Sequence, residues 1–250
     1  MQKILLIIIS AMVFYIAAEE SKTPPANDNT VEFYAGISLG WDHLIAKRHE
    51  QLVTDNNLNL TFSDNKSQTG NGLTGKIIAG FLWTIPNTAF ILSPEIYLGQ
   101  GSAEITKRES AHDPDANADK KFESTLRQRL TMGFILRAGF YLTNRQNNFL
   151  YALVGIDQSK FENKFILSSS AAGVDAPPLL EKRSKFLRSP VIGLGFERKF
   201  NRFKVGIDIR YMPYSEWGKY TKKAEVTDDV ISIKFKPRII STTLSICYLF

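Results

Sequence analysis

Residues 31–42 alternate almost without interruption between apolar side chains and polar or small ones. Successive side chains of a β-strand point to opposite faces, so this period of two predicts a strand with one apolar face. Seven further segments repeat the pattern and are bounded by turn residues or polar stretches. The eight predicted strands cover residues 31–42, 73–85, 90–99, 129–142, 149–160, 192–197, 203–211 and 240–250. The pattern therefore predicts an all-β chain.

The connections between these strands alternate between long and short. Four polar stretches occupy residues 44–72, 102–124, 159–185 and 213–229, and the intervening connections are turns of a few residues. Short turns on the side of both termini and long loops on the other are typical of transmembrane barrels. We therefore predict an eight-stranded antiparallel up-and-down transmembrane β-barrel over residues 31–250. Its four long loops are expected outside the cell.

The last predicted strand carries large side chains at every second position of one face. These are Leu244, Ile246, Tyr248 and Phe250. A transmembrane barrel needs its last strand complete, because an open edge in lipid leaves backbone groups without partners. The four residues resemble the C-terminal signature of bacterial outer-membrane β-barrels. The resemblance implies an assembly signal that is read by the barrel-assembly machinery.

The first 30 residues have a different composition. Lys3 precedes an apolar run, and small residues follow at Ala17 and Ala18. This order predicts a secretory signal peptide over residues 1–18, followed by a loose leader over residues 19–30. The apolar run is shorter than the ~20 residues of a spanning helix, so a membrane anchor is the weaker interpretation. We expect export to the outer membrane of a Gram-negative cell.

Alternation alone does not decide which face is inside. A soluble ligand-binding barrel would have an apolar cavity and a polar exterior. Aromatic residues favour the opposite arrangement, because those of the apolar face gather at the short-turn end, where they would form a girdle at one membrane interface. The predicted girdle consists of Phe33, Trp83, Phe90, Phe140, Phe196 and Phe203.

The polar face carries charges of both signs. Eight strands leave an interior just wide enough for side chains, and each buried charge needs a partner. We therefore predict a lumen filled by paired charges. The predicted network is Glu32, Lys76, Glu95, Arg129, Arg137, Asp157, Glu197, Lys204, Asp208 and Arg210. The alternative is a small-solute porin, in which Arg137 and Glu95 would line an aqueous path.

Charge and cysteine content change this picture little. The net charge of +6 is modest, and nucleic acid is a poor partner for an exported chain. Cys247 is the single cysteine and has no partner for an internal disulfide. Basic clusters in the long stretches, such as the one at 182–185, favour contact with outer-membrane lipid and lipopolysaccharide. A host-surface ligand is a further possible partner.

Residues 93–99 read Ser-Pro-Glu-Ile-Tyr-Leu-Gly, and residues 193–197 read Gly-Leu-Gly-Phe-Glu. Both segments resemble opacity-type outer-membrane surface antigens, and the resemblance extends over residues 31–250. It implies an eight-stranded barrel with exposed loops that act in adhesion or as surface antigens. It brings no catalytic residue and no cofactor to this chain.

The histidines could support two kinds of chemistry. A lipid A-modifying barrel enzyme would need a His and a Ser that face lipid near the outer leaflet, and His43 is the only histidine at a suitable height. No His-x-Ser arrangement accompanies it, so we predict no enzyme activity. His43, His49 and His112 lie in or beside the first two long stretches, where solvated side chains are a better interpretation than metal ligands.

Overall fold

A computed structural model describes residues 31–53, 59–60, 67–86, 88–113, 118–142, 147–171, 174–175, 179–217, 222–223 and 230–250. The predicted signal peptide and leader lie outside the described residues. Within these ranges the chain forms β-structure, and no helix is long and apolar enough to cross a membrane.

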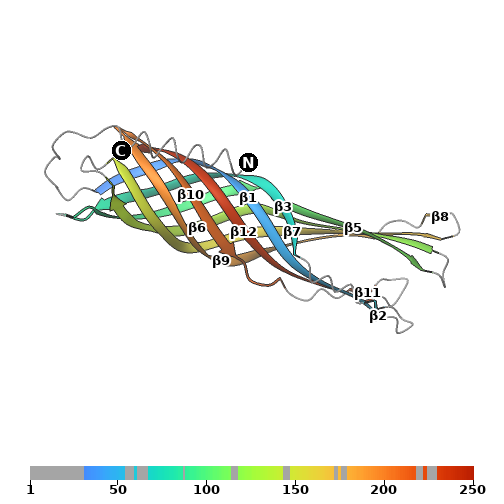
Figure 1. The fold of residues 1–250 in the computed structure, drawn as a ribbon. Helices are drawn as coiled ribbons and strands as arrows, with labels where there is room; N and C mark the ends of the chain where they lie inside the picture. Colours follow the sequence, from blue (N-terminus) through green and yellow to red (C-terminus); the bar gives the residue numbers. More distant parts are fainter. Residues whose placement is uncertain are drawn as a thin grey trace.

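Eight long strands form the body of the molecule (Figure 1). They are β1 (Val31–Val53), β3 (Gln68–Thr84), β4 (Phe90–Gly101), β6 (Ala118–Tyr141), β7 (Asn148–Ala171), β9 (Leu179–Phe200), β10 (Phe203–Pro213) and β12 (Val230–Leu249). Four shorter strands accompany them: β2 (Asn59–Leu60), β5 (Glu104–Asp113), β8 (Val174–Asp175) and β11 (Lys222–Lys223).

The long strands close into a ring. Each pairs antiparallel with its neighbour along the chain, and β12 pairs back with β1. This seam runs from Tyr34 opposite Leu249 to Val53 opposite Val230. Ring closure removes the open edges of the sheet. The predicted eight-stranded antiparallel up-and-down barrel is thereby confirmed.

Many residues of the four predicted loops form β-strands in the structure. For example, β6 and β7 remain paired up to Ala118 opposite Ala171, and β5 pairs with the outer part of β6. One sheet of β5, β6, β7 and β9 therefore projects beyond the barrel, and the outer parts of β1 and β12 form a second projection (Figure 1). The strand ends were missed because the apolar face changes sides: Ile156 points outward, whereas Phe161 points inward.

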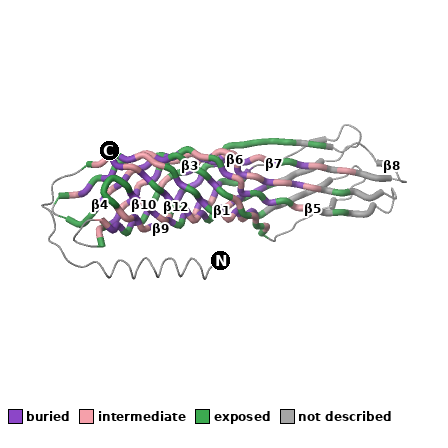
Figure 2. The backbone as a smooth tube through the Cα atoms, turned by 90° about the horizontal axis from the view of Figure 1, so that it is seen from above, coloured by how far each residue is buried: buried purple, intermediate pink, exposed green. Residues whose placement is uncertain are grey.

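The change of sides gives the barrel two kinds of interior. Figure 2 shows buried and exposed positions alternating along the strands. Toward the short-turn end, apolar side chains face outward and most polar ones inward. Toward the projections, most inward residues are apolar and buried, with Ser124, Gln128 and Asn163 as polar exceptions, and we call the apolar set the upper core. It consists of Leu44, Ala46, Ala103, Ile105, Leu126, Phe161, Phe165, Leu187, Met212, Tyr214, Trp217, Phe235 and Ile239.

The short-turn end is built from tight hairpins. The N–H of Ile85 donates to the carbonyl of Phe90 at 3.0 Å and closes the β3–β4 turn. In the β9–β10 hairpin, Phe200 lies opposite Phe203, so that only two residues connect the strands. The first of them, Asn201, has φ of 51°. Such a positive φ matches the twist of a two-residue hairpin, and Asn tolerates it.

We expect Asn201→Val to lower the free energy of unfolding by about 1–2 kcal/mol, because a β-branched residue is strained at positive φ. Asn201→Gly should stay within about 0.5 kcal/mol of the parent. Urea titration of the refolded protein in detergent micelles measures both values. Equal losses in the two variants would show that the backbone conformation is not the cause.

Candidate functional site

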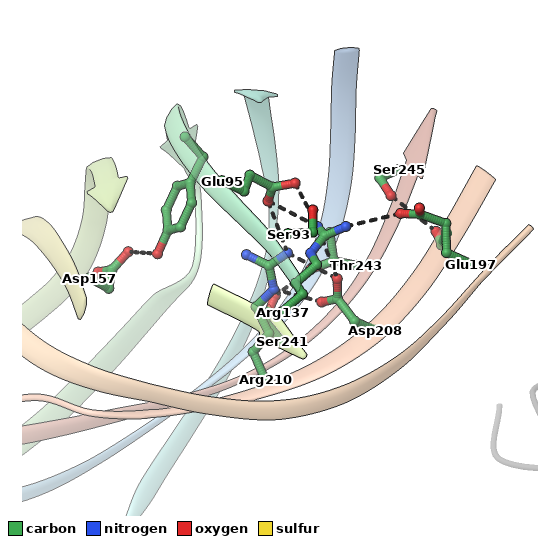
Figure 3. Close-up of polar contacts among 12 residues, drawn as sticks. Ser93, Glu95, Arg137, Asp157, Glu197, Asp208, Arg210, Ser241, Thr243 and Ser245 are labelled. Carbon is green, nitrogen blue, oxygen red and sulfur yellow. Dashed lines mark hydrogen bonds and ion pairs between the residues drawn. The ribbon is translucent and has the colours of Figure 1, made fainter. Parts of the chain in front are cut away.

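The candidate site is a cluster of charged side chains inside the barrel (Figure 3). It lies on the short-turn side of the upper core and is contributed by β4, β6, β9 and β10. We call it the lumen charge cluster. Its members are Glu95, Arg137, Glu197, Lys204, Asp208 and Arg210, all buried. Three carboxylates thus meet three cations in a region closed from solvent.

Arg137 bridges two strands of this cluster. One guanidinium nitrogen, Nη2, lies 2.8 Å from Glu95 Oε2, and the other, Nη1, lies 3.0 Å from Glu197 Oε2. Asp208 is a third acid at 3.9 Å. The side chains of Arg137 and Glu95 are both 0% exposed. A planar guanidinium suits this task, since its donors point in fixed directions toward two carboxylates.

The other two cations share acids with Arg137, because Lys204 also contacts Glu197 and Arg210 lies 3.9 Å from Glu95. Arg210 forms a two-point contact with Asp208, in which Nε lies 2.6 Å from Oδ1 and Nη2 lies 2.9 Å from Oδ2. Lys204 Nζ lies 3.1 Å from Glu197 and 3.2 Å from the centroid of the Tyr34 ring. The three buried cations of the cluster are therefore all engaged, as their burial requires.

Asp157 is held in a different way. Its carboxylate accepts hydrogen bonds from four hydroxyl groups, at 2.6–2.7 Å. The donors are Tyr97, Thr131, Ser159 and Tyr214. The prediction gave Asp157 a cationic partner, whereas the structure surrounds it with neutral donors. Several hydrogen bonds to the charged form can stabilise a buried carboxylate in place of a counter-ion.

Two further charged residues lie in the lumen outside this cluster. Asp42 is buried and accepts hydrogen bonds from the hydroxyls of Thr74 and Ser241. It was absent from the predicted network, although alternation had already placed it on the inner face. Lys76 is buried, but instead of the predicted ion pair its Nζ lies 5.0 Å from the centroid of the Tyr97 ring.

The prediction that Arg129 lies in the lumen is wrong. A register shift in β6 between Gln128 and Thr131 marks a β-bulge, and the extra residue turns Arg129 outward. There its Nη2 lies 3.1 Å from Glu162, which also lies 3.2 Å from Lys182. Desolvation raises the pKa of Glu162, but hydrogen bonds from Arg129 and Lys182 outweigh it, so the pKa lies below its ordinary value.

Glu32 also lies outside the lumen charge cluster. It faces inward at the short-turn mouth, where Lys199 Nζ lies 2.5 Å from Oε1 and 2.7 Å from Oε2. Both side chains are partly exposed. The predicted strand ends at residue 197 and leaves Lys199 in the following turn, but β9 continues to Phe200 and keeps Lys199 on the inner face. Glu32 therefore has a partner at the mouth of the barrel.

The predicted girdle and C-terminal residues lie on the outer face. Phe33, Trp83, Phe90, Phe140 and Phe203 are exposed there, and Phe196 is half-buried. Leu244, Ile246, Tyr248 and Phe250 share this face in register with them. Some rings touch, since the centroids of Phe203 and Tyr248 lie 5.3 Å apart and those of Tyr248 and Phe250 5.2 Å apart. Their roles as membrane girdle and assembly signal stay predictions.

His43 lies on the outer face of β1, and its Nδ1 is 2.7 Å from Asn71 Oδ1. This contact is with an amide and not with a serine hydroxyl. The side chains of His49 and His112 lie outside the described part. Among the side chains that the structure describes, no three His, Cys, Asp or Glu residues gather as a metal site would require.

Comparison with known proteins gives similarities of fold only. No family model matches the chain, and no curated protein matches it. The outer membrane protein OprG from Pseudomonas aeruginosa is 12% identical with a TM-score of 0.49, covering 92% of this chain and 99% of its own. The outer membrane protease OmpT from Escherichia coli is 11% identical with a TM-score of 0.41, covering 93% and 99%.

The attachment invasion locus protein Ail of Yersinia pestis is 17% identical with a TM-score of 0.30, covering 88% of this chain and 99% of its own. At such values these likenesses establish neither a family nor an activity. The fold rests instead on the strand pairing of this chain, and the resemblance to opacity-type antigens stays a prediction.

We expect Arg137→Met to lower the free energy of unfolding by about 3–5 kcal/mol, because it leaves Glu95 and Glu197 buried without their shared cation. Arg129→Met is the matched control outside the barrel and should cost about 1 kcal/mol or less. Adding Glu95→Gln to Arg137→Met should recover part of the loss. Urea unfolding in micelles compares the variants, and equal costs for Arg137→Met and Arg129→Met would contradict the assignment.

Proposed function

We propose that this protein is an integral outer-membrane β-barrel that displays its projecting sheets outside the cell, as a surface antigen or adhesin or as a structural membrane protein. The observation that carries the proposal is a band of exposed apolar side chains around the ring. Each long strand contributes at least one: Leu39, Ile77, Ile96, Phe134, Ile156, Leu194, Ile209 and Leu244. Soluble proteins rarely expose an apolar surface of this extent.

Strand length supports the same proposal. A transmembrane β-strand needs about 9–11 tilted residues to cross the hydrocarbon core. β10 has 11 residues and β4 has 12, and both have apolar outward positions. The longer strands exceed this length only toward the projections, where Lys160 and Lys164 on β7 face outward. The strands of the apolar band are therefore long enough to cross a membrane core.

The interior favours display over transport. A porin lined by Arg137 and Glu95 would keep these side chains in contact with water, yet both are fully buried. Beyond them, toward the projections, the upper core adds large buried rings such as Phe161 and Trp217. Water would have to cross a charged layer and an apolar one. We therefore propose a filled barrel whose function resides in its exterior.

The proposed partners follow from this placement. Outer-membrane lipid would contact the apolar band, and lipopolysaccharide would surround the start of the projections. The barrel-assembly machinery would read the strand that ends at Phe250. A host-surface ligand would bind the projecting sheets.

The effect of Ile77→Arg on stability distinguishes a membrane barrel from a soluble one. Ile77 is 68% exposed near the middle of the apolar band. In lipid the substitution should lower the free energy of unfolding by about 2–4 kcal/mol, because the charge faces hydrocarbon. Thr106→Arg, on the outer face of β5, is the control and should change it by less than about 0.5 kcal/mol. Urea unfolding in lipid vesicles measures both values, and a neutral Ile77→Arg would contradict the membrane placement.

Heat-modifiability tests the same proposal without substitutions. Residues 19–250 are refolded in detergent, and boiled and unboiled samples are compared on a gel. A difference in migration, with β-rich circular dichroism in detergent or lipid only, is expected for a membrane barrel. Folding to the same β-rich state in plain buffer would contradict the proposal and would favour a soluble ligand-binding barrel.

A further inference from the structure

Charge is distributed unevenly around the barrel where the projections begin. On the sheet of β5, β6 and β7, three outward arginines lie beside acids, whereas the outward Lys160 and Lys164 have no carboxylate of the described side chains within ion-pair distance. The ion pairs are Arg108 with Glu123 at 2.9 Å, Arg127 with Glu104 at 3.7 Å and Arg129 with Glu162 at 3.1 Å. The charges of these three arginines are therefore already compensated.

The side built from β9, β12 and β1 is different. Four of the cations that face outward there lie next to the apolar band, and we call them the seam basic patch: Lys47, Arg188, Lys236 and Arg238. On these strands and the 214–217 segment, the outward acid among the described residues is Glu216, and it lies 3.6 Å from a fifth cation, Lys234. The patch has no carboxylate of the described chain within ion-pair distance.

Backbone pairing holds the patch together. Lys47 lies directly opposite Lys236 across the β1–β12 seam. The N–H of Tyr214 donates to the carbonyl of Pro237 at 3.0 Å, and the N–H of Ser215 donates to that of Arg188 at 3.1 Å. Like charges directly opposite each other on one sheet face are destabilising. An anion between them would relieve this repulsion.

The patch adjoins the apolar band. On β12, Arg238 is the next outward residue beyond Ile240, and on β1, Lys47 is the next beyond Ile45. On β9, Arg188 follows Ile192 and Pro190. In the proposed membrane orientation these cations lie where the head groups of the outer leaflet begin. A ligand with acyl chains on the apolar band would bring its head group to them.

We propose that the seam basic patch binds the phosphate groups of a phosphorylated glycolipid of the outer leaflet, on this side of the barrel. The inference rests on the proposed membrane function and adds a defined site to it. Arg188 and Arg238 supply guanidinium groups that suit two-point contact with phosphate, and Lys47 and Lys236 supply mobile point charges. Arg108, Arg127 and Arg129 on β5 and β6 already lie beside carboxylates, so a bound phosphate would stabilise them less.

The test compares lipid A that carries both phosphates with dephosphorylated lipid A. The protein, residues 19–250, is refolded in detergent with EDTA and titrated with each lipid. Native mass spectrometry measures the fraction of protein that carries bound lipid. The parent should prefer the phosphorylated lipid. Lys236→Gln with Arg238→Gln should weaken its binding roughly 30-fold. Arg108→Gln with Arg127→Gln removes the same charge elsewhere and should weaken it by less than about threefold.

Three results would overturn the inference. They are equal affinity of the parent for the two lipids, an equal loss in both double variants, and full competition by inorganic phosphate at the lipid's concentration. If the first double variant fails to show heat-modifiability, Lys47→Gln with Arg188→Gln replaces it under the same criteria. If the unsubstituted protein folds in micelles but binds both lipids equally, the phosphate site is wrong and the membrane function still stands. If it folds in plain buffer, the proposed membrane function is wrong.

Discussion

The pairing of β1 with β12 is the interaction on which the rest of the structure depends. It turns a sheet into a ring, and a ring is what allows one face of every strand to be apolar without an open edge. The register matters as much as the pairing. Asp42 lies opposite Ser241, and Trp41 lies opposite Thr242. A slip of one residue would turn Asp42 outward and bring Trp41 into the lumen.

The polarity of the inward residues changes along the barrel together with the polarity of the outward residues. Where outward residues are apolar, the lumen holds the ion pairs together with apolar side chains such as Ile91 and Ile135, and where outward residues are polar, the lumen holds the upper core. Tyrosine serves the boundary between these layers, because one side chain offers a ring to one layer and a hydroxyl to the other. The ring of Tyr214 packs edge-on against Phe161 with centroids 4.9 Å apart, while its hydroxyl donates to Asp157 at 2.6 Å.

Alternation was sufficient to predict the ring and the facing of most side chains, because the period of two follows directly from strand geometry. The position of Arg129 was not accessible in this way, since a β-bulge inserts one residue and leaves no local signature in the composition. The donors to Asp157 were equally hidden. Tyr97 and Thr131 come from other strands, and only the final register brings their hydroxyls to one carboxylate. The length of β7 was missed where its apolar face changes sides.

The upper core has an evolutionary consequence. Inward residues such as Phe161 and Phe235 stabilise the start of the projections, whereas outward neighbours such as Lys164 and Thr106 contribute little to that packing. The two sets alternate along the same strands, yet selection can act on them separately. A lineage can therefore replace the charges and shapes that it presents to its surroundings, one outward position at a time, while the framework beneath them keeps its stability.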